Sequence, residues 1–287
     1  MKKKLVLLIT FICNSILLIS SDTFQDKPLF PLLGEEARQR GYELPNPYGI
    51  NVIYVDMKQN VDIESIKLSP MIGNLNIGKN LNLTASKAKT VNTNKLVRAD
   101  IWIFPFLNVY GILGKTKGNS SANVNGTFSI PSFFPGGKPI LIPIKDIDFT
   151  LKYEGTTYGV GTVLAAGNKN FFSLIDFNYT KTTLNIIEGE INALVVSPKI
   201  GYNFDFYNTK NSIWIGGMYQ DISQTLKGNL RDIGVDIPGK FEVNQKSSSP
   251  WNNVIGFRTE INKSVEFTTE VGFGKRKSVT LSLGYRF

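Results

Sequence analysis

The last ten residues of the chain alternate strictly between apolar and polar positions. One face carries Val279, Leu281, Leu283, Tyr285 and Phe287, and the other carries Ser278, Thr280, Ser282, Gly284 and Arg286. Successive side chains of a β-strand point to opposite faces, so the pattern predicts a strand with one apolar and one polar surface.

The same alternation recurs upstream, in residues 97–103, 147–154, 157–164, 194–206, 251–262 and 265–273. The links at 262–264 and 275–277 are short and polar, as hairpin turns are. No apolar run long enough for a membrane helix follows residue 21. The chain is therefore expected to be an all-β protein.

The N-terminus has the layout of a secretory signal peptide. Lys2, Lys3 and Lys4 precede an apolar stretch at 5–19, and Ser20 and Ser21 offer small residues for cleavage. We expect residues 1–21 to be removed, because the apolar core is short for an uncleaved anchor. Cys13 lies within this segment, so a lipoprotein anchor is not expected.

Composition narrows the class of protein further. Hydrophobic residues make up 42% and charged residues 19%, which is too apolar for a disordered chain and too polar for a bundle of membrane helices. The net charge of +9 falls to 9 − 3 = +6 without the three N-terminal Lys, and the remaining basic residues are scattered. Nucleic acid is therefore not an expected partner.

Two patterns favour a transmembrane barrel over a soluble sandwich. Aromatic residues such as Tyr202, Phe206 and Trp251 fall near strand ends, as in the girdles of outer-membrane barrels. Connections alternate between short (167–170, 207–211) and long (182–189, 226–250), as periplasmic turns and outer loops do. Residues 48–287 are thus predicted to form an antiparallel up-and-down transmembrane β-barrel of about 12 strands, with 10–14 possible.

Three segments leave alternatives open. Residues 61–93 alternate weakly, and residues 118–143 contain Pro131, Pro135, Pro139 and Pro143, so the latter form either a loop folded into the lumen or a strand pair joined by a Pro-rich turn. Residues 22–47, with a short helix expected at 33–40, form either a periplasmic N-terminal segment or a small plug.

The ending Leu281-Ser282-Leu283-Gly284-Tyr285-Arg286-Phe287 resembles the C-terminal assembly signal of bacterial outer-membrane proteins, with Tyr285 and Phe287 in the signal positions. Residues 31–38, 41–45, 104–111, 155–161 and 272–278 resemble an uncharacterised family of proteobacterial outer-membrane β-barrel proteins. The resemblance implies the outer membrane of a Gram-negative bacterium and the barrel fold, and no particular activity. Outer-membrane lipid, lipopolysaccharide and the barrel assembly machinery are the partners it implies.

Catalytic chemistry finds little support. The chain has no His, the usual base beside a Ser or Cys nucleophile. Glu266 and Glu270 share a strand face at roughly 13 Å, beyond the separation of a glycosidase pair. Glu260 and Glu266 could lie closer across their turn, but pairing with Arg258 and Arg286 is the simpler reading. No catalytic, metal or cofactor site is therefore predicted.

Charges of both signs on the polar strand faces are the expected lumen lining. These candidates are Arg98, Asp100, Lys152, Glu154, Lys199, Asp205, Arg258, Glu260, Glu266, Glu270 and Arg286. We expect a passive pore or small-solute channel. The alternative is a closed structural or binding barrel acting through long outer loops, and a barrel enzyme without His ranks last. Close ion pairing would favour the closed barrel, and separated charges a wet path.

Overall fold

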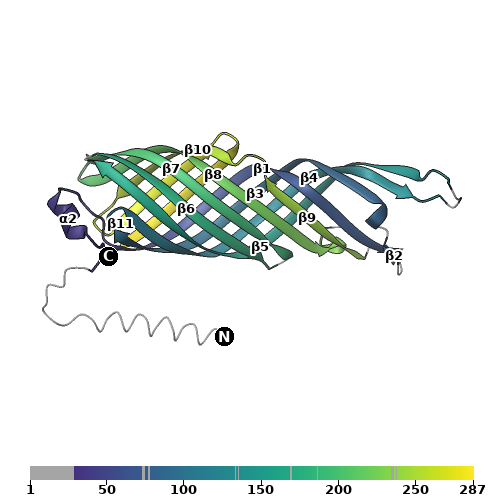
Figure 1. The fold of residues 1–287 in the computed structure, drawn as a ribbon, viewed down its shortest axis with the longest axis horizontal. Coiled ribbons are helices and arrows are strands. Elements are labelled where there is room, and N and C mark those ends of the chain that lie inside the picture. The colour runs from purple at the N-terminus through teal and green to yellow at the C-terminus, as the bar shows by residue number, and fades with distance from the viewer. Residues whose placement is uncertain are drawn as a thin grey trace, which may run out of the picture.

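The computed structural model describes residues 29–72, 75–76, 78–132, 134, 136–168, 170–185, 187–233, 236 and 238–287. The predicted signal peptide at 1–21 lies outside these residues. The described chain forms one long antiparallel barrel (Figure 1). Its strands are β1 (Tyr48–Ile72), β2 (Leu75–Asn76), β3 (Leu81–Phe104), β4 (Leu107–Ile130), β5 (Ile140–Asn168), β6 (Phe171–Leu184), β7 (Glu188–Phe206), β8 (Thr209–Asn229), β9 (Gly239–Ser247), β10 (Trp251–Glu260), β11 (Val265–Phe273) and β12 (Arg276–Arg286).

The sheet contains twelve strands, and ten of them close a complete ring. The ring follows the chain from β1 through β3, β4, β5, β6, β7, β8, β10 and β11 to β12, and β12 pairs with β1 over Gly49–Gln59. Every neighbour is antiparallel, as in an up-and-down barrel. The expected fold class is thus confirmed, and closure leaves no unpaired strand edge within the ring.

Strand β9 extends the barrel beyond the ring. It pairs with β1 over Val61–Pro70 and with β8 over Ser223–Asn229. It therefore occupies the place between β1 and β8 that β10, β11 and β12 occupy nearer the termini. The expectation that residues 226–250 form one long outer loop is therefore wrong. Phe241 and Val243 of β9 are buried, so packing of its alternate side chains stabilises this return of the chain into the sheet.

The two stretches that were ambiguous in the sequence are strands. Residues 61–72 belong to β1 and residues 81–93 to β3. Strands β4 and β5 pair up to Ile130 and Ile140, with one irregularity between Val124 and Gly126. Residues 131–139 connect this pair, so the strand pair with a Pro-rich connection is the correct alternative. The β4–β5 hairpin projects far beyond the rest of the barrel (Figure 1).

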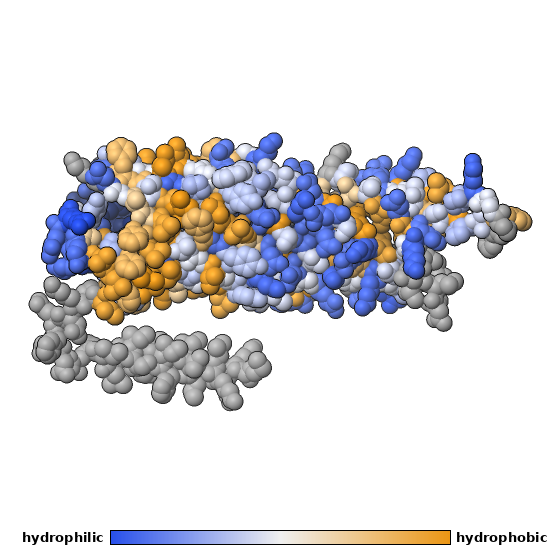
Figure 2. Space-filling model, viewed as in Figure 1, coloured by the Kyte–Doolittle hydropathy of each residue, from blue (hydrophilic) through white to orange (hydrophobic). Residues whose placement is uncertain are grey.

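The apolar side of a strand changes along its length. In β5, Leu151 and Tyr153 are 3% and 2% exposed and point inward, whereas Tyr158 and Val160 are 48% and 67% exposed and point outward. The strand keeps its alternation, but the apolar positions move from odd to even numbers. On the face that Figure 2 shows, apolar residues gather in a band over the half of the barrel near the termini, and the surface beyond it is mostly polar.

Aromatic side chains mark both borders of this apolar band. Near the termini, Tyr48 stacks on Phe287 at 5.7 Å between ring centroids, and Phe171 meets Tyr202 at 5.0 Å. A second set lies where the outward apolar stretches end: Tyr54 on β1, Tyr158 on β5, Tyr179 on β6 and Trp251 on β10.

Helix α2 (Gly34–Gln39) confirms the short helix expected at 33–40 and lies at the termini end of the barrel (Figure 1). The chain leading from it is tied to the rim, because Leu32 N–H donates to Ile103 O at 2.8 Å. Within the described residues, no helix is both long enough and apolar enough to span a membrane.

Candidate functional site

Asp100 is the centre of a hydrogen-bonded network inside the barrel ring. Its carboxylate is 1% exposed and accepts from Arg286 Nη2 at 2.9 Å, Asn51 Nδ2 at 3.0 Å and Asn108 Nδ2 at 2.7 Å. These partners come from β12, β1 and β4, so the network spans a wide arc of the wall. These hydrogen bonds and the Arg286 charge offset the cost of burying the Asp100 side chain.

Arg286 also ties the N-terminal segment to the ring. Its Nε donates to Asn46 O at 3.0 Å, and Asn46 Nδ2 donates back to Arg286 O at 3.3 Å. Gly49 provides the space: a Cβ there would lie 2.6 Å from Asp100 Oδ2 and 2.7 Å from Arg286 Nη1. The segment before β1 therefore closes over the charged network.

A second cluster lies on β10 and β11. Arg258 forms an ion pair with Glu260, and its Nε lies 3.6 Å from Glu266 Oε2. Glu266 in turn lies 4.0 Å from Arg286 Nη1, which links this cluster to Asp100. Glu260, Arg258, Glu266 and Arg286 thus form one continuous chain of ion pairs.

A third cluster joins β7, β8 and β11, which lie within one arc of the ring. Lys199 Nζ on β7 lies 2.5 Å from Glu270 Oε2 on β11, and Trp214 Nε1 on β8 donates to the same oxygen at 2.8 Å. The side chains of Lys199 and Glu270 are 14% and 9% exposed. On the far arc, Tyr110 of β4 donates to Asp176 of β6, and Arg98 lies 3.7 Å above the Tyr110 ring.

Large inward aromatic side chains pack over inward glycines of neighbouring strands. Trp214 covers Gly256, Tyr110 covers Gly161 and Phe172 covers Gly201, with the ring so close that an added Cβ would overlap it. Gly161 lies on the inward face of β5, opposite Tyr110 in the register. The glycines let the rings lie across the lumen and fill it.

Beyond the ring, the interior is a hydrophobic core. Its buried members are Met57, Leu151, Tyr153, Leu184, Ile187, Ile191, Ile222, Leu226, Leu230, Phe241 and Val243. They come from β1, β5, β6, β7, β8 and β9, from the short helix η2 (Leu230–Ile233) and, for Ile187, from the connection before β7. Beside this core, Ser120 donates to Gln245 at 3.0 Å and Gln245 donates to Gln224, which bridges β4, β9 and β8.

The structure brings most of the lumen candidates together, but three lie elsewhere. Lys152 and Glu154 lie on the outward face of β5, since their neighbours Leu151 and Tyr153 point inward, and Glu154 pairs with exposed Lys117 at 2.9 Å. They are therefore not lumen residues. Asp205 is exposed at the rim, opposite Lys210 in the register. The terminal Tyr285 and Phe287 are each 53% exposed on the outer face.

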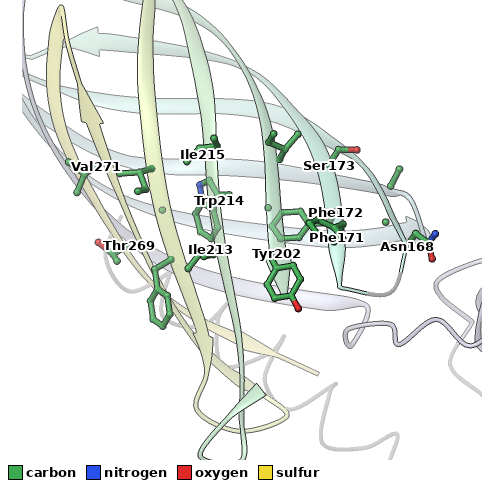
Figure 3. A pocket seen from close by; sticks show the side chains of 17 residues that line it. Asn168, Phe171, Phe172, Ser173, Tyr202, Ile213, Trp214, Ile215, Thr269 and Val271 are labelled. Carbon is green, nitrogen blue, oxygen red and sulfur yellow. The ribbon is translucent and has the colours of Figure 1, made fainter. Parts of the chain in front are cut away.

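The outer wall carries open, apolar depressions within the apolar band. One of about 990 Å³ crosses β5 to β11, and its outward lining includes Phe171, Tyr202, Ile213 and Ile215. Figure 3 shows Trp214 on the strand that also carries Ile213 and Ile215. A second, of about 940 Å³, surrounds the outward Gly111. Surfaces of this chemistry suit acyl chains rather than polar ligands.

Several interior residues escaped the sequence reasoning. Asn51, Asn108, Tyr110, Asp176 and Trp214 all contact the charged clusters. Asn51, Asn108, Tyr110 and Trp214 carry no charge, so a search for charged lumen residues passes over them. Asp176 does carry a charge, but no alternating segment was identified from the sequence at β6. Inward glycines at Gly161 and Gly256 were the available clue, because a large ring on the next strand has to occupy their space. Within the described chain, no cluster of Cys, Asp and Glu is arranged to hold a metal ion.

Comparison with known proteins gives distant structural likeness. No protein-family model matches the chain, and no curated protein matches its sequence. The outer membrane protein OprG from Pseudomonas aeruginosa aligns with 85% of this chain and 98% of its own, at TM-score 0.40 and 8% identity. The β domain of the Bordetella autotransporter BrkA covers 84% and 100%, at TM-score 0.34 and 7% identity.

The toluene transporter TbuX from Ralstonia pickettii covers 86% of this chain and 90% of its own, at TM-score 0.28 and 8% identity. Likeness this distant transfers no substrate or activity to this chain. The arguments below therefore rest on its own strands, surface and interior.

Proposed function

We propose that the chain is an integral outer-membrane barrel that is closed to free solute flow and acts through the part standing beyond the membrane. The expected cleaved signal peptide and periplasmic termini belong to this proposal. The proposal thus favours the closed structural or binding barrel over the passive pore. An enzymatic role has no support from the paired interior charges.

Membrane insertion is supported by strand lengths as well as by the apolar band. Strands β10, β11 and β12 contain 10, 9 and 11 residues, and they lie entirely within the ring. A tilted strand needs about 9–11 residues to cross the hydrocarbon core. Their outward residues, including Ile255, Val271 and Leu283, are 49%, 42% and 55% exposed and would face lipid.

The occupied interior carries the closed-barrel proposal. Ion pairs and rings from most strands of the ring meet in the lumen, with Asp100 and Glu270 buried among them. The hydrophobic core then fills the space beyond, with Leu226 and Phe241 1% and 2% exposed. An ion moving along the barrel axis would have to separate the ion pairs of the ring. It would then have to lose its water in the hydrophobic core, which is costly.

Conductance of the refolded protein in a planar bilayer tests this proposal. We expect a silent bilayer with the wild type, while heat-modifiable gel mobility confirms that the barrel is folded. Asp100→Asn combined with Glu270→Gln should raise the frequency of brief openings, because both variants loosen the charged layer. Stable ohmic steps with the wild type would contradict closure and restore the passive pore.

A further inference from the structure

Among the residues that the structure describes, Arg276 is a fully buried cation without a charged partner. Arg276, at the start of β12, is 1% exposed, and its Nε and Nη1 have no hydrogen-bond partner. Its Nη2 reaches only Met218 O, at 3.4 Å. The interior acids Asp100, Glu266 and Glu270 are already paired with other cations.

The Asn252 side chain holds the backbone of Arg276 in place through two hydrogen bonds. Asn252 Nδ2 donates to Arg276 O at 2.8 Å, and Arg276 N–H donates to Asn252 Oδ1 at 3.1 Å. Asn252 is itself 6% exposed. This pair of hydrogen bonds holds the first residue after the β11–β12 turn and keeps the guanidinium inside the barrel.

In the described part of the chain, the neighbours of Arg276 also have buried polar atoms without a hydrogen-bond partner. Gln59 lies directly opposite on β1, is 4% exposed, and lacks partners for both Nε2 and Oε1. Thr90 lies opposite Gln59 on β3, is 0% exposed, and its Oγ1 lacks a partner. Gln220 Oε1, two residues beyond Met218 on β8, completes the group. Buried polar atoms are paired in nearly all proteins, so four such residues together point to a ligand.

We infer that this group is a binding site for a small oxyanion enclosed between the charged network and the hydrophobic core. The Arg276 guanidinium provides the charge and a planar fork of donors that matches two oxygens of a phosphate or carboxylate. Gln59 Nε2 and Thr90 Oγ1 add neutral donors. Gln59 Oε1 and Gln220 Oε1 need donors in return, which favours an anion that carries a hydroxyl, such as hydrogen phosphate.

The site is independent of the proposed closure, since its test measures a bound anion and not conductance. The full chain is refolded in a phosphorus-free detergent with either inorganic phosphate or chloride at equal ionic strength. Free anion is removed by gel filtration, and bound phosphorus is measured per chain. We expect one equivalent after refolding in phosphate and a higher unfolding temperature than in chloride. Because no phospholipid is present, this phosphorus can come only from inorganic phosphate.

Variants assign the bound anion to the site. Arg276→Gln should lose the phosphorus and the difference between the two buffers, whereas Arg231→Gln, whose side chain is 67% exposed on η2, should keep both. Gln59→Glu places a carboxylate opposite Arg276. It should raise the unfolding temperature in chloride and abolish phosphorus retention, and it serves as the test if Arg276→Gln does not fold.

Two results would overturn the inference. The first is wild-type protein that retains no phosphorus and unfolds at the same temperature in both buffers, which would leave water as the occupant. The second is a folded Arg276→Gln or Gln59→Glu variant that retains as much phosphorus as the wild type, which would place the anion elsewhere.

Discussion

Asp100 shows how a single carboxylate holds several strands in place. It receives hydrogen bonds from side chains of β12, β1 and β4 while being almost completely buried. The sequence identified it as an inward charge, because it alternates with apolar neighbours. The number of partners could not be predicted, since it depends on which strands meet across the lumen.

Substituting Asp100→Asn should destabilise the barrel by roughly 3–5 kcal/mol, because Arg286 would keep a buried charge without its closest counter-charge. The measurement is urea unfolding of the refolded protein in lipid or detergent. Asp148→Asn is the matched control, since Asp148 is exposed and accepts one hydrogen bond from Asn123. Equal losses in the two variants would show that the buried network contributes little.

Glycine positions offer a second test at the scale of single residues. Gly256→Ala should destabilise the protein by about 1–3 kcal/mol, because a Cβ there overlaps the Trp214 ring that fills the lumen. Gly111→Ala should be tolerated, since Gly111 points outward and nothing lies within 4 Å of an added Cβ. The stability of both variants is measured after refolding as the temperature at which the folded band is lost in heat-modifiable gel mobility. A Gly256→Ala protein as heat-resistant as Gly111→Ala would mean that the ring has room to move.

At the scale of elements, β9 is held by a charged row across three strands. Glu242 lies between Lys67 of β1 and Lys227 of β8, with Oε–Nζ distances of 3.4 and 3.0 Å. Hydrogen bonds from these lysines and from Asn244 lower the pKa of Glu242 from 4.5 to about 2. The hydrogen bond from Lys227 has the largest effect. The row stands beyond the apolar band, where water reaches it.

The lowered pKa of Glu242 gives a pH dependence with a defined sign. Its contribution to stability is complete above about pH 4.5, because the carboxylate is then charged in both states, and it is lost as the pH falls towards about 2. Wild type and Glu242→Gln should therefore differ most in unfolding midpoint at neutral pH and converge over this acidic interval. A difference that stays constant down to about pH 2 would show that the charge of Glu242 has no role.

Strand β5 shows what the sequence could and could not predict about the elements. Its alternation at 147–154 and 157–164 correctly predicted strand structure in both parts. The inference that Lys152 and Glu154 face the lumen was wrong, because it took the apolar face to be outward throughout. Alternation gives the two faces of a strand, but the solvent around the barrel decides which one is apolar, and that solvent changes along β5.

Strand β9 was missed for a different reason. Residues 239–247 do alternate, with Phe241, Val243 and Gln245 inward. The segment lies within a long, polar connection, and its pairing partners are β8 and the distant β1. Pairing between residues so far apart in the chain leaves no local signal.

At the scale of the whole molecule, the proposed orientation places the β4–β5 side outside the cell and the short turns in the periplasm. A cysteine scan can test it, since Cys13 in the predicted signal peptide is the only Cys of the chain. We expect Thr150→Cys to react with a membrane-impermeant maleimide on intact cells, because residue 150 is exposed beyond the apolar band.

The matched control is Asn170→Cys, in the turn between β5 and β6 at the termini end. It should react only after the outer membrane is permeabilised. Labelling of Asn170→Cys but not Thr150→Cys on intact cells would reverse the orientation. Labelling of neither on intact cells, with both reactive in lysates, would remove the protein from the outer surface.

The reach of the β4–β5 hairpin has a consequence for encounters at the cell surface. Strand β5 is 29 residues long, and at about 3.3 Å per residue its length of about 96 Å is nearly four times the height of an apolar belt of about 25 Å. In the proposed orientation, an antibody or phage approaching from outside would meet Ile140, Leu141 and Ile142, which are 64%, 61% and 45% exposed, before any part of the barrel wall. Pro139 and Pro143 lack the N–H that an added strand needs. Pro143 therefore removes one of the N–H donors of β5 near this tip, and the exposed side chains of Ile140, Leu141 and Ile142 are the surface that a partner meets first.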